Sequence, residues 1–268
     1  MATIDQWKGS RLRCVLFSGM TRAAIRRELL NMIAHAGISS ERVDIDDSGF
    51  LYYPKGLNEA NEYRFSMSDG LIDESKRKNL IKWWLGIDCE TDKQTPNWDF
   101  VCTARIDGID GLILVEAKAH RDELYKKDPC KAGQESRTVI STAIQLAQAG
   151  LRKDHPDIRF DMDYSYQISN RLAWGWKLAS LEIPVILIYL GCLECAEMDH
   201  GSYRILRKSE DWKRLVMNYP GKKRGGSWAT IPAKIWNSCI RVNDTPLFPI
   251  IASINIQPEG VIRREYAD

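Results

Sequence analysis

The sequence predicts an α/β protein in which helices flank one central mixed β-sheet, and three observations support this fold class. Helices are predicted in four separate segments of the chain. A predicted β-hairpin occupies the middle of the chain, from Trp98 to Lys118. A continuous apolar run, Ile183–Leu190, has the length of a buried strand. Because helices separate this run from the hairpin, we expect the strand to lie parallel to its neighbour.

Composition indicates a folded protein and excludes some classes. The chain has 268 residues, of which 44% are hydrophobic and 28% are charged, so it can bury a large core and is not a disordered tail. The 38 basic and 36 acidic residues give a net charge of only +2, so any affinity for nucleic acid must come from local patches. No GxxxxGK[ST] or GxGxxG sequence occurs, which argues against an ATPase motor or a nicotinamide enzyme.

The apolar runs and the cysteines predict a cytoplasmic protein. The longest apolar run, Ile183–Leu193, is about half the span that a bilayer helix needs. The amino terminus has no apolar stretch ahead of a small-residue cleavage site. Seven cysteines, an odd number scattered along the chain, fit a reducing environment. We therefore expect neither secretion nor contact with a membrane.

The amino-terminal part of the chain is predicted to contain two helices and a short strand. The first helix covers Thr21–His35, with Thr21 as its N-cap and Gly37 just past its end. A turn-rich stretch follows, Ser39–Asn61, in which the aromatic segment Phe50–Tyr53 is expected to form a strand or a hairpin. The second helix covers about Leu71–Leu85 and carries acidic residues in its first turn, where the helix dipole favours them.

The middle of the chain alternates strands and helices. Trp98–Ile106 is a predicted strand, Asp107–Gly111 a tight turn, and Leu112–Lys118 an apolar strand that ends in charged residues. Thr138–Leu151 and about Tyr164–Leu181 are predicted helices, and the buried strand comes after them. This order predicts a hairpin followed by a helical crossover.

The carboxy-terminal third, from about Met198, is expected to form turns and short elements wrapped on the core. Its apolar segments are thin and broken, so it is not predicted to be an independent domain. It also contains a basic run between glycines, Gly221–Gly226. The prolines that interrupt it are Pro220, Pro232, Pro246 and Pro249.

Three charged side chains are predicted to meet at one end of the hairpin. If the hairpin loop has two residues, Gly108 and Ile109, or four, Asp99 lies opposite Lys118. Glu116 and Lys118 share a face because side chains alternate along a strand, and Asp99 is expected on that same face. Such a cluster is unusual in an apolar strand, since a buried unpaired charge is costly.

A divalent cation would relieve the repulsion between the two carboxylates. Asp99 and Glu116, together with the backbone carbonyl of Ala117, offer hard oxygen ligands of the kind that Mg²⁺ or Mn²⁺ prefers. A metal-activated water, positioned by the ammonium group of Lys118, would be a nucleophile for a phosphodiester. The alternative to a metal site is a strand end that emerges into solvent, where Glu116 and Lys118 form an ordinary surface ion pair.

These residues resemble a known nuclease motif. Pro96-Asn97-Trp98-Asp99, sixteen further residues, and then Glu116-Ala117-Lys118 at the end of an apolar strand are similar to the PD-(D/E)XK nuclease superfamily. The resemblance implies that Asp99 and Glu116 bind the metal and that Lys118 assists the attacking water. It implies a restriction-endonuclease-like core over about residues 70–191 of a single domain, 1–268, with an N-terminal extension, 1–69, and a C-terminal wrap, 192–268.

The resemblance suggests further site residues. Many members of the superfamily place a Gln or Tyr on the helix after this strand, a part that Gln145 or the Tyr166-Gln167 pair could take. Glu74, on the helix before the hairpin, is a further candidate metal ligand. Candidate contacts to nucleic acid, to be weighed against ordinary solvated or loop positions, are Gln167, His120, Lys222, Lys223 and Arg224.

One other cluster invites a metal hypothesis. Cys192 and Cys195, with His200 nearby, have thiolates at a spacing that can hold zinc. A fourth ligand would have to come from distant Cys239 or Cys14, so a buried pair at a strand end is the favoured interpretation.

The predicted function is hydrolysis of nucleic-acid phosphodiester bonds, with DNA favoured over RNA, by an Mg²⁺- or Mn²⁺-dependent nuclease. The principal alternative is a catalytically silent nuclease-fold module that binds nucleic acid or a protein partner. A metal-dependent hydrolase of another phosphate ester is a third class. The sequence leaves a homodimer open as the assembly.

Overall fold

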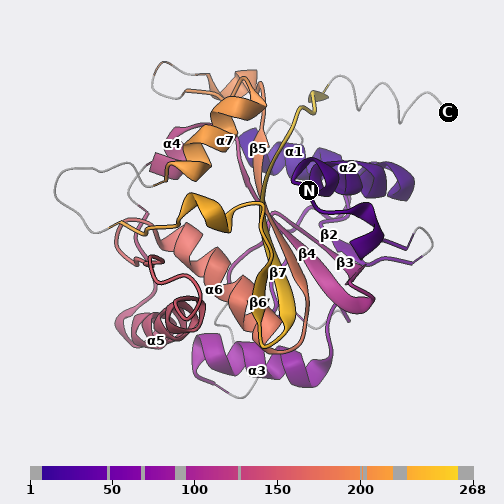
Figure 1. The fold of residues 1–268 in the computed structure, drawn as a ribbon. Coiled ribbons are helices and arrows are strands. Elements are labelled where there is room, and N and C mark those ends of the chain that lie inside the picture. The colour runs from indigo at the N-terminus through magenta and orange to yellow at the C-terminus, as the bar shows by residue number, and fades with distance from the viewer. Residues whose placement is uncertain are drawn as a thin grey trace.

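The computed structural model describes residues 8–46, 49–67, 70–87, 95–125, 128–199, 201, 204–219 and 228–258. Within these residues the chain forms a mixed β-sheet with helices on both faces (Figure 1). The predicted α/β class, with helices flanking a central mixed sheet, is confirmed. No helix in this part of the chain is both long and apolar enough to cross a bilayer.

The sheet has seven strands in the order β1-β3-β4-β5-β7-β6, with β2 beside β1 on the same edge of β3. β4 is parallel to β5, and β5 is parallel to β7, while the other pairs are antiparallel. Strands β4 and β5 therefore lie in the middle of the sheet, and β3 and β7 also have neighbours on both sides. The strand bounds are β1 Val43–Asp44, β2 Tyr52–Tyr53, β3 Phe100–Ile106, β4 Ile109–Lys118, β5 Val185–Cys192, β6 Ile240–Val242 and β7 Thr245–Ile254.

The hairpin β3–β4 forms with a register two residues away from the prediction. Its loop is Asp107-Gly108, and both residues have positive φ, 52° and 78°, as a two-residue hairpin turn requires. Ile106 therefore pairs with Ile109, and Phe100 pairs with Val115. Continuing this register places Asp99 opposite Glu116 rather than Lys118. A shift of two preserves which residues share a face, because side chains alternate with a period of two.

The connection from β4 to β5 runs through three helices, and the predicted parallel crossover is confirmed. These are α4 (Asp122–Tyr125), α5 (Gln134–Leu151) and α6 (Tyr166–Ser180). Helices α5 and α6 approach closely at Gly150, where a Cβ would lie 2.3 Å from Nε1 of Trp176. Only glycine fits there without a shift of the indole or of a helix.

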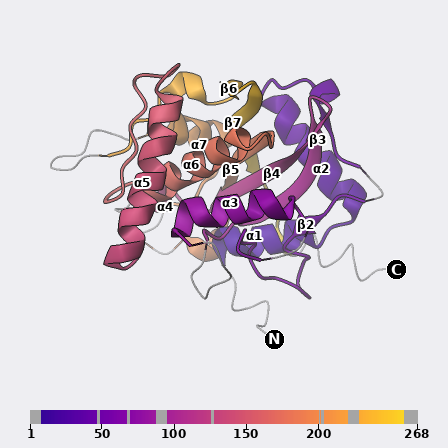
Figure 2. The same ribbon diagram turned by 90° about the horizontal axis from the view of Figure 1, so that it is seen from below.

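One face of the sheet packs on α3, α5, α6 and α7, as Figure 2 shows for α3, α5 and α6. Helix α3 (Glu74–Leu85) begins three residues later than predicted, because Asp73 is its N-cap, and it ends at Gly86 with φ 71°. Helix α7 (Ser209–Met217) inserts Trp212, whose indole N–H donates to the carbonyl of Tyr189 at 3.1 Å. Leu112 and Leu114 of β4 point to this face.

The other face packs on α1 (Gly9–Ser18) and α2 (Arg22–His35). Helix α2 agrees with the prediction, including the Thr21 cap, which accepts from the N–H of Ala24 at 3.3 Å. Helix α1 was not predicted. Its Arg13 is buried and pairs with Glu197, and its Nε donates to the carbonyl of Ile256 at 3.1 Å. The short 3₁₀ helices are Ser40–Arg42, Ala196–Met198 and Ala233–Ile235.

The carboxy-terminal third contributes more to the sheet than was predicted. Strand β7 is ten residues long and lies between β5 and β6, so the expectation of only short wrapped elements was wrong. Pro246 and Pro249 lie within this strand, paired with Arg241 and Leu187. Proline lacks the N–H that a ladder uses and argues against a central strand, which is why the sequence pattern concealed β7.

Candidate active site

Strand β4 delivers two charged side chains into the interior. Glu116 and Lys118 follow Leu112 and Leu114 in alternation, so they point toward the face covered by α6. They are only 1% and 5% exposed. Both lie where β4 pairs in parallel with β5, opposite Tyr189 and Gly191. Because both side chains are buried, the alternative of a strand end in solvent with an ordinary surface ion pair is wrong.

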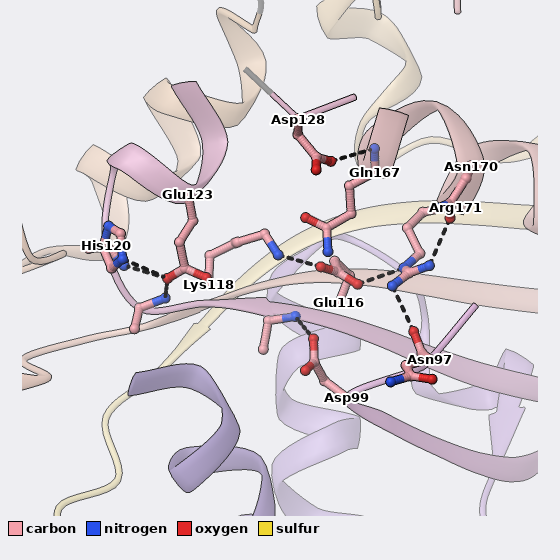
Figure 3. A network of polar contacts seen from close by, with 12 residues as sticks. Asn97, Asp99, Glu116, Lys118, His120, Glu123, Asp128, Gln167, Asn170 and Arg171 are labelled. Atoms are coloured by element: carbon pink, nitrogen blue, oxygen red, sulfur yellow. Dashed lines mark hydrogen bonds and ion pairs between the residues drawn. The ribbon is translucent and has the colours of Figure 1, made fainter. Parts of the chain in front are cut away.

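Asp99 reaches the same place from the residue before β3. Its Oδ2 accepts the backbone N–H of Ala117, the residue between Glu116 and Lys118, at 2.8 Å. An acceptor of a strand N–H lies near the plane of the sheet, so Asp99 stands at the strand edge rather than squarely beside Glu116. In the view of Figure 3, Asp99 approaches β4 from below, while Lys118 and Arg171 lie above it. Asp99, Glu116 and Lys118 therefore lie together at one end of the hairpin, as predicted. The prediction that all three side chains share one face of the sheet holds only in part.

Arg171, on α6, joins this cluster and was not predicted. Its Nε donates to Oε2 of Glu116 at 2.6 Å, while Lys118 Nζ donates to Oε1 (Figure 3). Its other nitrogens reach the backbone carbonyl of Asn97 and the side chain of Asn170, each at 2.7 Å. The guanidinium also lies 4.5 Å from the ring centre of Trp98. One side chain therefore ties Glu116 to the chain segment that carries Asp99.

The cationic partners keep Glu116 ionised. Burial alone would raise the pKa of Glu116, but the charges of Arg171 and Lys118 outweigh it and hold this pKa below its ordinary value. Burial would lower the pKa of Lys118, yet Glu116, Glu123 and Asp99 raise it. Glu116, Lys118 and Arg171 thus form a fully charged buried group.

Asp99 has the opposite tendency. Burial first, and then the negative charge of Glu116, raise the pKa of Asp99 to about 7, although Lys118 and the Ala117 N–H act against the rise. Two nearby carboxyl groups therefore have pKa values pushed in opposite directions, a pattern that concentrates at functional sites.

The donor set suits a hard divalent cation. Within the described part of the chain, Oδ1 of Asp99 accepts no hydrogen bond, and each oxygen of Glu116 accepts one, which leaves lone pairs on both acids. No group of three or more His, Cys, Asp or Glu side chains in this part of the chain is arranged to hold a metal ion. Two carboxylates supplemented by water are the ligands that Mg²⁺ commonly uses in proteins, so Asp99 and Glu116 fit such an ion.

The first turn of α6 closes the site on one side. Gln167 donates its backbone N–H to Asp128 at 3.0 Å, and Figure 3 shows its side-chain amide extending toward Lys118 and Glu116. It lines two hollows, a small one of about 10 Å³ shared with Lys118 and a groove of about 320 Å³ shared with Arg171. Of the two proposed positions for the helix residue, Gln167 is at the site, whereas Gln145 is exposed on α5 and interacts with Ser141.

Other predicted site residues lie apart from this cluster or beside it. His120, two residues beyond Lys118, is buried next to the cluster, and its Nε2 lies 3.5 Å from Oε1 of Glu123. Glu74 pairs with Arg77 at 2.6 Å at the start of α3. That helix start lies beside the first residues of β4, so Glu74 is not brought to Glu116. Lys222, Lys223 and Arg224 lie outside the described residues.

Cys192 and Cys195 are buried free thiols at the end of β5, with Cys195 Sγ 3.5 Å from the carbonyl of Cys192. His200 lies outside the described residues. The thiol of Cys14 lies against that of Cys192, but no group of three or more His, Cys, Asp or Glu side chains among the described residues is arranged to hold a metal ion, so the buried-pair interpretation fits this geometry.

A cavity of about 580 Å³ lies at the other end of the hairpin and is lined by Asp44, Asp73, Arg105 and Asp110 among others. The buried charged cluster is remote from it. The chemistry of its residues and the groove at Arg171 thus distinguish the charged cluster from this cavity.

Comparison with known proteins gives no match: no protein-family model, curated protein or solved structure is similar to this chain. The functional assignment therefore depends on the residues themselves.

Proposed function

We propose that the chain is a divalent-metal-dependent nuclease with a restriction-endonuclease-like core, acting on DNA in preference to RNA. One observation carries the proposal: Asp99 hydrogen-bonds to the residue that separates Glu116 from Lys118. Two acids and an amine from adjacent strands are thereby gathered at one strand end. The motif resemblance and the sheet order both fit this function.

The roles of the side chains follow from their contacts. Asp99 and Glu116 would hold the cation. Arg171 and Lys118 would keep Glu116 ionised before the cation binds. When bound, Mg²⁺ or Mn²⁺ would lower the pKa of a water and offset phosphate charge. Lys118 uses one of its three N–H donors on Glu116 within the described residues. The remaining donors can orient a water and stabilise negative charge on the phosphate.

We infer that a substrate approaches the site through the groove of about 320 Å³ that Asn97, Gln167 and Arg171 line. Asp99 is only partly buried, whereas Glu116 is almost fully enclosed. A phosphate would therefore approach from the Asp99 and Gln167 side. Gln167 can donate or accept a hydrogen bond there.

The test measures cleavage and metal uptake together. Purified protein is incubated with supercoiled plasmid in Mg²⁺, Mn²⁺ or EDTA, and Mn²⁺ binding is measured by calorimetry. We expect nicking that needs the metal, that is lost in Lys118→Ala and Glu116→Gln, and that persists in the exposed-lysine control Lys153→Ala. Equal activity in Lys118→Ala and wild type would remove the proposed chemistry.

A second function is favoured by one observation. Both oxygens of Glu116 already accept hydrogen bonds from cations, so the cluster is a closed ion network that could serve the fold alone. In that case the chain is a silent module that binds nucleic acid or a protein. Such a module would bind DNA without cutting it and would take up no Mn²⁺ in the same calorimetry.

A further inference from the structure

A groove rich in arginine lies beyond the end of β4. It measures about 430 Å³ and is bounded by the segment Arg204–Arg207 and by α7. Four arginines line it, with a single acidic side chain, Asp211. The arginines are Arg121, Arg204, Arg207 and Arg214.

The backbone that carries these arginines is firmly placed. The segment continues the pairing of β4: the N–H of Arg121 donates to the carbonyl of Arg204 at 2.9 Å, and His120 forms a bridge with Ile205. Leu206 is buried in the core, which fixes the segment from below. The arginine side chains thus project from a rigid support rather than from a loose loop.

The neighbouring acids offset little of this charge. Arg207 pairs with Asp199 and Arg214 pairs with Asp211, both at 3.1 Å, but in each pair both side chains are well exposed. Exposed pairs of this kind contribute little stability and are screened by salt. A phosphate can therefore replace Asp199 and Asp211 as the partner of these arginines at small cost.

The groove lies close to the candidate active site. Arg121 follows Lys118 by three residues, which at about 3.3 Å per residue is roughly 10 Å along the chain. Along the axis of duplex DNA, the phosphates of one strand advance about 3.4 Å each. A duplex whose axis runs from Lys118 toward the arginines, with its reacting phosphate at Lys118, would therefore bring phosphates about three nucleotides away to the arginines.

We propose that this arginine groove binds the phosphate backbone of the nucleic acid on one side of the cleavage point. The proposal rests on the proposed function and adds the direction in which the substrate extends from the site. Arginine suits the task because its planar guanidinium donates two parallel hydrogen bonds to a phosphate and stays charged at every relevant pH. Contacts to phosphate carry no sequence information, so the groove sets affinity and position rather than sequence preference.

The test is the salt dependence of DNA binding. A fluorescent 30-base-pair duplex is titrated with wild type and with Arg204→Gln/Arg207→Gln in EDTA, by anisotropy, from 50 to 300 mM KCl. Each lost phosphate contact reduces the slope of log K against log salt by about 0.9. We expect the double variant to lose about 1.8 of slope and, extrapolating that slope from 1 M, roughly 60-fold in affinity at 0.1 M salt.

Matched variants separate this effect from general charge loss and misfolding. Arg27→Gln/Arg105→Gln removes two exposed arginines that are also paired with acids, at sites away from the groove, and should leave the slope unchanged. Arg204→Lys/Arg207→Lys should keep most of the slope. Circular dichroism checks that each variant is folded.

The outcomes distinguish the two proposals. If wild type cuts plasmid but the groove variant keeps full affinity and slope, the groove proposal is wrong and the nuclease proposal stands. If the groove variant loses slope while wild type never cuts, the groove binds phosphate and the nuclease proposal is wrong. If wild type neither binds nor cuts, both are wrong.

Discussion

Replacing Asp99 with asparagine should stabilise the metal-free protein at high pH. The pKa of Asp99 is raised from about 3.8 to about 7 by burial and by the charge of Glu116. Between these two values the folded state keeps a proton that the unfolded state has lost. Stability therefore falls as pH rises through this window and stays lower above pH 7. Asparagine keeps an oxygen for the Ala117 N–H and never ionises.

The magnitude follows from the shift. About three pKa units at 1.36 kcal/mol each give a ceiling of ~4 kcal/mol for the ionisation cost at pH 8. At pH 5 the unfolded state has lost most of its proton and the folded state almost none, so the cost is ~1.7 kcal/mol. The gain from Asp99→Asn should thus be larger at pH 8 than at pH 5 by about 2–3 kcal/mol, less whatever residual solvation of Asp99 removes.

The assay is urea unfolding in EDTA at pH 5 and pH 8 for wild type, Asp99→Asn and Asp110→Asn. Asp110 is almost fully exposed, so its variant should change stability little at either pH. Adding Mg²⁺ at pH 8 should stabilise wild type and not Asp99→Asn, because binding to the folded state adds stability. A loss of stability in Asp99→Asn that is equal at both pH values would refute the reasoning.

Three further predictions concern the cluster and its support. Lys118→Ala should lower kcat, measured as the rate of plasmid nicking, by about 10²–10⁴-fold. Arg171→Gln leaves Glu116 with one cation and should cost about 3–5 kcal/mol in urea unfolding, and it should also weaken Mn²⁺ binding. Gly191→Ala would place a Cβ 2.6 Å from the indole of Trp212 and should lower Tm at a cost of about 1–3 kcal/mol. Its control, Gly133→Ala, meets nothing within 4 Å, and an equal loss of Tm in both variants would contradict the packing argument.

The sequence could predict the hairpin and the crossover because their signals are local. An apolar strand that ends in Glu116 and Lys118 is visible from a few adjacent residues, and parity alone predicts that the two share a face. The register differs by two residues because the loop is Asp107-Gly108, with both residues at positive φ, rather than Gly108-Ile109. That choice depends on turn geometry, which composition alone does not determine.

Arg171 escaped prediction because its partner, Glu116, is 55 residues away in the chain. A signal existed: Arg171 stands next to Leu172 and three residues after Ile168 on a helix whose face is otherwise buried. A charged residue on such a face needs a charged partner inside the protein. The same reasoning applies to Arg13 of α1, which is buried among apolar residues and pairs with Glu197.

Helix α6 fixes how far apart the two acids stand. One nitrogen of its Arg171 donates to Glu116, and another donates to the backbone carbonyl of Asn97, two residues before Asp99. The position of α6 depends in turn on its packing against α5, where Gly150 closely approaches Trp176. A substitution at that helix crossing, which touches neither carboxylate, would displace α6 as a unit and alter the spacing of the acids that are proposed to hold a cation. Remote packing mutations are therefore a route by which the metal preference of the proposed site would change.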